Sequence, residues 1–225
     1  MNYFKQGFLL ALIVWAMGAC KKNSLETSPL ASLNVTNAVV GGKTVKLNSN
    51  LVDSATNYNY KAFGIRPGST SIYLYPAGDS THPYYNNMPS TINGGIYSLF
   101  LAGNLATQVD TLFVQEAIPV YSDSSCGVRC INLCVNGSPI KVNLTATPTA
   151  LEFPVLSYKQ LSAFKTYPAL SVNGTYSFQV RDTANTVLAT YSLATPRFFN
   201  CTLVWKGMKG GTGTNVPGVM RVNNY

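Results

Sequence analysis

The sequence predicts an all-β protein composed of two tandem β-sandwich domains. Three observations lead to this prediction: the composition, an internal repeat, and strands in which apolar and polar residues alternate. Charged residues make up only 11% of the 225 residues, whereas Tyr (14), Gly (18) and Pro (12) are frequent. This mixture favours strands and turns that carry a neutral, hydroxyl-rich surface.

The first twenty residues have the pattern of a bacterial lipoprotein signal. Lys5 supplies a positive start, and residues 7–16 form an apolar run as long as a signal core. The run is too short to cross a membrane, which takes about 20 residues. MGAC at 17–20 resembles a lipobox, where small residues admit the peptidase and the cysteine thiol takes a diacylglycerol. We therefore expect residues 1–19 to be removed and Cys20 to be lipidated.

Residues 20–30 are polar and are expected to tether the first domain to the membrane. Acyl chains such as palmitate on Cys20 make the membrane a predicted partner, because two or more chains hold a protein there stably. Position 21 is Lys rather than Asp, so the inner-membrane retention signal of some bacteria is absent. We expect a lipid-anchored protein of the outer membrane, on either its periplasmic or its surface side.

An internal repeat divides the remaining chain into two copies. The segment 32–48 (SLNVTNAVVGGKTVKLN) aligns without a gap with 127–143 (GVRCINLCVNGSPIKVN), an offset of 95 residues (127 minus 32). Each segment reads as two strands around a turn that contains glycine, which is the pattern of a hairpin. The repeat predicts one β-sandwich at 31–121 and a second at 126–225.

Further strands in each copy alternate between apolar and polar residues. IYLY at 72–75 and YSFQVR at 176–181 show this period of two, and YSLFLAG at 97–103 matches CTLVWKG at 201–207. Alternation is typical of a sandwich strand with one face in the core and the other in water. We expect this arrangement throughout, with the two domains forming a rigid rod.

The two copies resemble the domain-of-unknown-function 4397 family of exported bacterial proteins. The resemblance rests on VRCINLCVNGSPIKVNL at 128–144, on YSLFLAG followed by DTLFVQEAIPVY at 110–121, and on the lipoprotein start at Cys20. It implies an immunoglobulin-like or transthyretin-like sandwich and an exported location. It implies no activity.

The sequence offers no catalytic constellation and indicates no cofactor. His82 is the sole histidine, in a loop without a nucleophile motif, and the eight acidic residues are scattered. Gly41-Gly42-Lys43-Thr44 hints at a phosphate loop, but position 37 is Asn where that motif starts with Gly. We therefore expect a protein that is not an enzyme.

Four cysteines remain after Cys20: Cys126, Cys130, Cys134 and Cys201. In an oxidising compartment an even number favours disulfides, and four cysteines allow three connectivities. A bond from Cys130 or Cys134 to Cys201 on a neighbouring strand is geometrically easier than a bond within one strand. A zinc site and free buried thiols are the two alternatives, and we expect no metal.

The best binding candidates are aromatic. Tyr73 and Tyr75 alternate outward, and Tyr84 and Tyr85 follow in the next loop. Tyrosine faces suit stacking on sugar rings or contacts with peptides, although aromatic pairing between strands that stabilises the sheet is the favoured explanation of these residues.

The net charge of +8 comes from 16 basic and 8 acidic residues, and the basic ones are scattered. We therefore expect no nucleic-acid partner. The predicted function is a non-catalytic binding module of the cell envelope for a glycan or a protein. The alternative is a structural or assembly subunit that pairs through edge strands.

Overall fold

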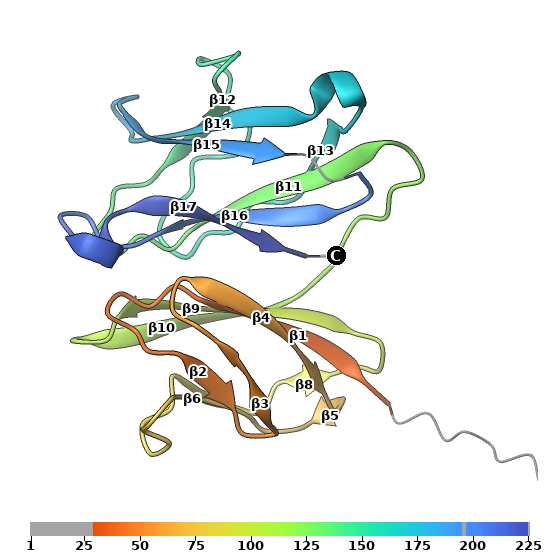
Figure 1. The fold of residues 1–225 in the computed structure, drawn as a ribbon, viewed down its shortest axis with the longest axis vertical. Coiled ribbons are helices and arrows are strands. Elements are labelled where there is room, and N and C mark those ends of the chain that lie inside the picture. The colour runs from red at the N-terminus through yellow and green to blue at the C-terminus, as the bar shows by residue number, and fades with distance from the viewer. Residues whose placement is uncertain (1–28, 195–196, 225) are drawn as a thin grey trace, which may run out of the picture.

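The computed structural model describes residues 29–194 and 197–224, and within them the prediction of an all-β, sandwich-type fold is confirmed (Figure 1). Two 3₁₀ helices, η1 (Ser171–Asn173) and η2 (Gly213–Asn215), are the helical elements of this described part. No helix in these two ranges is long and apolar enough to span a membrane. The predicted lipidation site, Cys20, lies outside the described residues.

The first sandwich consists of two four-stranded sheets and one small ribbon. Its sheets have the strand orders β10-β9-β1-β4 and β3-β2-β6-β7, and β5 pairs with β8. The strand bounds are β1 (Ala31–Asn37), β2 (Val45–Leu47), β3 (Asn50–Ala55), β4 (Asn59–Ile65), β5 (Gly68–Ser69), β6 (Ile72–Pro76), β7 (Tyr85–Asn87), β8 (Ser90–Thr91), β9 (Ile96–Asn104) and β10 (Gln108–Gln115).

The second sandwich has one four-stranded and one three-stranded sheet. Their strand orders are β13-β11-β16-β17 and β12-β14-β15. The strand bounds are β11 (Ser125–Asn132), β12 (Lys141–Leu144), β13 (Lys165–Pro168), β14 (Thr175–Arg181), β15 (Val187–Ala194), β16 (Asn200–Lys206) and β17 (Gly218–Asn223).

The internal repeat corresponds to a repeated topology. The first strand of each copy pairs with one antiparallel neighbour and one parallel neighbour: β1 with β4 and β9, and β11 with β13 and β16. Gly103, the residue before the last of β9, and Gly207, directly after β16, have φ of +84° and +102°. A Cβ at either position would lie within 2.6 Å of a backbone oxygen, so the turn after each strand requires glycine.

The two sandwiches pack against each other through their β1–β9 and β11–β16 sheets (Figure 1). The interface holds a buried apolar cluster of Ala38, Phe100 and Ala102 from the first sandwich and Ile131, Leu133, Val204 and Val222 from the second. The expectation that one face of every strand meets water is therefore wrong for β1, β9, β11 and β16. Their second faces are buried by the other domain, so the domains form a sheet-on-sheet block rather than a rod joined at its ends.

Polar contacts also cross this interface. The Asn34 side-chain amide donates to the Asn223 carbonyl at 3.0 Å, and the Tyr58 hydroxyl donates to the Asn215 side chain at 2.8 Å. On another part of the interface, the Tyr158 hydroxyl donates to Asp110 at 2.9 Å. These directional contacts fix the register of one sandwich on the other, because each needs a defined donor and acceptor position.

Candidate functional site

The outer face of β6 carries the two tyrosines that the alternation singled out. Ile72, Leu74 and Pro76 point into the core of the first sandwich, and Tyr73 and Tyr75 are half-buried on the opposite side. The two rings lie with their centroids 6.0 Å apart and their planes inclined at 47°. They form a stepped aromatic surface at the outside of the molecule rather than a part of the core.

Polar side chains from neighbouring strands flank this surface. The antiparallel register places Lys46 of β2 beside Tyr75, and Asn86 of β7 beside Tyr73. Because side chains of directly paired residues lie on the same face of a sheet, an ammonium group and an amide border the rings. We call Tyr73, Tyr75, Lys46 and Asn86 the tyrosine face.

The β6–β7 loop forms one rim of the tyrosine face. The Tyr73 hydroxyl donates to the Ser80 carbonyl at 2.6 Å, which holds its ring beside this loop. Asp79 accepts from the Thr81 hydroxyl at 2.8 Å and lies 2.9 Å from His82 Nδ1. The hydrogen bond from Thr81, followed by that from His82, lowers the pKa of Asp79 to about 2. The rim therefore presents an ionised carboxylate beside a histidine whose side chain is 84% exposed.

The second sandwich contains the same strand without the tyrosines. Lys141 occupies the repeat position of Lys46, and it pairs with Arg181 where Lys46 pairs with Tyr75. Gln179 then corresponds to Tyr73. Arg181 donates to the Gln179 side chain at 2.6 Å and to the Asn185 carbonyl at 2.7 Å, so the polar side chains of this face bond to each other and to the adjoining turn, and Arg181 Nε is left without a partner. The outward tyrosines are thus not a requirement of the sandwich.

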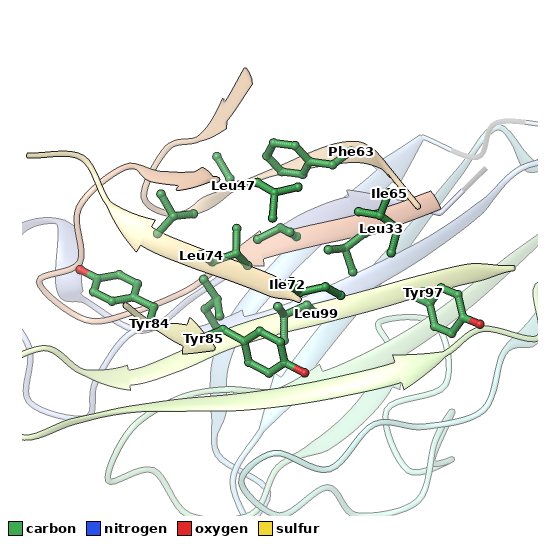
Figure 2. Close-up of a cluster of buried hydrophobic side chains, with 14 of the residues drawn as sticks. Leu33, Leu47, Phe63, Ile65, Ile72, Leu74, Tyr84, Tyr85, Tyr97 and Leu99 are labelled. Atoms are coloured by element: carbon green, nitrogen blue, oxygen red, sulfur yellow. The ribbon is translucent and has the colours of Figure 1, made fainter. Parts of the chain in front are cut away.

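Two of the four predicted binding tyrosines do not belong to this surface. Tyr84 and Tyr85 are 7% and 8% exposed and lie in the core cluster of the first sandwich (Figure 2). Tyr85 stacks on Phe113 with centroids 6.3 Å apart, and the Tyr84 hydroxyl accepts from the Lys43 backbone N–H at 3.2 Å. Their assignment to a binding face was wrong, because this edge of the sandwich needs large side chains to close its core.

The four described cysteines are free and buried, which corrects the expectation of disulfides among Cys126, Cys130, Cys134 and Cys201. Cys126 and Cys130 lie on β11, and Cys201 on β16 pairs with Val128, midway between them. Each offset of two residues across parallel strands separates the Cα atoms by about 8 Å, beyond the range for a disulfide. Cys126 and Cys130 are about 13 Å apart along one strand. The thiols serve as small apolar side chains in the second core.

We predict that these thiols resist labelling in the folded protein. Burial raises the pKa of both Cys130 and Cys201 to about 12, so little thiolate forms near neutral pH. In a soluble form of residues 20–225 with Cys20→Ser, a maleimide should label these two cysteines only after denaturant is added. Intact mass should correspond to four reduced cysteines, and a mass lower by two hydrogens would contradict the free-thiol arrangement.

The remaining chemistry-bearing residues do not converge. The described residues contain no group of three or more His, Cys, Asp or Glu side chains placed to hold a metal ion. Gly41, with φ of +67°, forms the turn before Gly42 and Lys43, as a hairpin connection requires. Among the described residues, four carboxylates are in ion pairs with Lys or Arg side chains: Asp53, Asp110, Glu116 and Glu152.

The comparisons with known proteins find similarity among solved structures. No protein-family model matches the chain, and no curated protein matches it. Among solved structures, the C-terminal domain of AlgF from P. aeruginosa matches 40% of this chain and 100% of its own, at 16% identity and a TM-score of 0.30.

Proposed function

We propose that this protein is a non-catalytic glycan-binding module of the cell envelope that binds through the tyrosine face. The observation that carries the proposal is the contrast between the two copies. Both keep the apolar inner face of the strand and the neighbouring lysine, but the first places Tyr73 and Tyr75 outward where the second has Gln179 and Arg181. A pair of aromatic side chains that the fold does not need is better explained by a ligand.

The chemistry of the tyrosine face suits a sugar polymer. Tyrosine rings offer flat apolar surfaces to the C–H faces of sugars, and the Tyr73 hydroxyl, which donates to the Ser80 carbonyl, keeps its acceptor lone pairs at the edge. Lys46, Asn86 and Asp79 supply a cation, an amide and a carboxylate around the rings, which matches the many hydroxyls of a glycan. The face is open rather than a closed pocket, so a chain can run across it. The net charge of +8 favours an acidic polymer at long range.

The location is part of the same proposal. The lipoprotein-type sequence at residues 1–20, with lipidation expected at Cys20, supports a location at the outer membrane, where envelope polysaccharides are available. The resemblance to the domain-of-unknown-function 4397 family belongs to this proposal too, since it implies an exported location and implies no activity.

We predict that exchanging the tyrosines for their counterparts weakens binding without loss of stability. Binding of soluble residues 20–225 (Cys20→Ser) to immobilised polygalacturonate, hyaluronan, dextran and amylose would be compared with that of Tyr73→Gln/Tyr75→Arg. Loss of two stacking rings should weaken binding by about 1–3 kcal/mol, or roughly 5- to 150-fold. Thermal unfolding should not change, because the second copy shows that Gln and Arg fit the same strand.

Gln179→Ala/Arg181→Ala in the second sandwich is the matched control and should leave binding intact. The proposal fails if none of the polymers binds, if the exchange leaves binding unchanged, or if binding and thermal stability fall together. Capture of an envelope protein alone, by crosslinking through Tyr73, would replace the glycan with a protein partner.

A further inference from the structure

One edge strand of this protein differs from the others in its lack of protection. Edge strands expose unpaired backbone groups, and proteins protect them with charges, prolines, bulges or short length. Among the strands that the structure describes, nine edge strands carry a charged residue or have at most three residues: β3, β4, β5, β7, β8, β10, β12, β13 and β17. The tenth, β15, has eight residues, VLATYSLA, with no charge and no proline.

The backbone of β15 has an open hydrogen-bonding side. The Thr145 backbone N–H donates to the Ser177 carbonyl, so the Ser177 backbone faces β12 and its neighbours in β14 face β15. In an antiparallel pair the hydrogen-bonding direction alternates along the strand, so Ala189, Tyr191 and Leu193 bond to β14. The N–H and C=O groups of Thr190 and Ser192 therefore point away from the sheet.

The two ends of this open edge are not available for regular strand pairing. Arg221 donates to the Ala194 carbonyl at 3.4 Å, which caps one end. At the other end the register with β14 shifts and leaves Leu188 as a bulge. The free part is thus the centre of the strand, and it is symmetric about Tyr191.

We propose that a second copy of this chain pairs with the centre of β15, strand to strand and antiparallel, about a two-fold axis at Tyr191. Thr190 of each copy then faces Ser192 of the other, and their N–H and C=O groups form four hydrogen bonds. An isologous contact places each residue against the same surface of its mate, so a charged strand would bring like charges together. β15 carries no charge and so avoids this repulsion between like charges. The edge strands β3, β4, β10 and β17 each carry a charged residue and would not avoid it.

Charge at the strand ends is also compatible with this pairing. Arg221 lies beside Ala194, and the turn before β15 carries Asp182. Antiparallel pairing brings the Ala194 end of each copy toward the turn of the other, so Arg221 approaches an acidic residue rather than a second Arg221. The contact is short, and stable dimers bury about 1,200–2,000 Å², so we expect weak, concentration-dependent association.

Sedimentation of soluble residues 20–225 (Cys20→Ser) over a concentration series tests the pairing. The weight-average mass should rise toward that of a dimer, and Ser192→Pro should return it to that of a monomer because the substitution removes an outward N–H. Ser192→Thr keeps that N–H and should dimerise like the parent. A monomer at every concentration, or a dimer that Ser192→Pro leaves unchanged, overturns the proposal.

A crosslink tests the register and does not depend on Ser192→Pro folding. Paired residues that exchange hydrogen bonds have Cα atoms about 5.5 Å apart, within the range of a disulfide. Oxidising a mixture of Thr190→Cys and Ser192→Cys should therefore give a crosslinked heterodimer, while each variant alone should give little. Equal crosslinking in the separate variants, or none in the mixture, rules out this register. Neither experiment involves the tyrosine face, so failure of this pairing can be distinguished from failure of the proposed glycan binding.

Discussion

Replacing Arg129 with methionine should destabilise the folded chain by about 3–5 kcal/mol, because it leaves the Glu116 carboxylate buried without its partner. Arg129 of β11 donates to both oxygens of Glu116, at 2.7 and 2.5 Å, and the two side chains are 5% and 1% exposed. Glu116 follows β10 of the first sandwich, so this ion pair joins the two domains. Chemical denaturation with urea measures the loss.

The buried charge explains the size of this effect, and a double substitution checks the explanation. Arg129 also donates to the Thr202 hydroxyl at 2.9 Å, and its guanidinium lies 4.4 Å from the centre of the Phe164 ring. Glu116→Leu together with Arg129→Met removes both charges and keeps apolar volume, so it should cost much less than Arg129→Met alone. Lys61→Met at the exposed pair with Asp53 is the surface control and should cost at most about 1 kcal/mol. Equal losses for the single and double variants would contradict a penalty from the unpaired carboxylate.

The sequence was sufficient to predict the all-β sandwich fold because turn glycines and period-two alternation are local signals. It also contained a signal for the domain interface that alternation obscured. SLFLA at 98–102 and VRCINLCV at 128–135 are nearly continuous apolar runs, which indicate strands buried on both faces. The expectation that one face of every strand contacts water came from β6 and β14, which lie in the outer sheets and do alternate between apolar and polar residues. It does not apply to the inner sheets.

The tyrosine face could be predicted only in part for a related reason. Which way Tyr73 and Tyr75 point follows from alternation within one strand. Lys46 and Asn86 join them through pairing between strands, which a single segment of sequence does not specify. Tyr84 and Tyr85 follow Pro83 at the start of a short edge strand, where two adjacent tyrosines carry no period that assigns them to a face. The pairing of Glu116 with Arg129 depends on the packing of two domains and has no local signal.

Replacing Phe100 with alanine should destabilise both sandwiches together, by about 3–5 kcal/mol. Phe100 lies on β9 of the first sandwich, is 1% exposed, and packs in the interface cluster with Ile131 and Val204 of the second. Truncation removes apolar contacts and leaves a cavity that stiff sheets on either side cannot close. If the interface couples the domains, a change in the first must shift the unfolding of the second.

Trp205 measures this coupling, because it lies on β16 in the core of the second sandwich and is the one tryptophan after residue 20. Its fluorescence should report a transition displaced by Phe100→Ala to the same extent as circular dichroism of the whole chain. Phe199→Ala removes a ring that is 52% exposed, so it serves as the control and should barely move either signal. Two separate transitions, with the Trp205 signal unchanged, would mean that the sandwiches unfold independently. Coincident transitions would mean that the buried faces of β1, β9, β11 and β16 make one cooperative unit. That unit would hold the outer sheets, with the tyrosine face on one and β15 on the other, in a constant relative position.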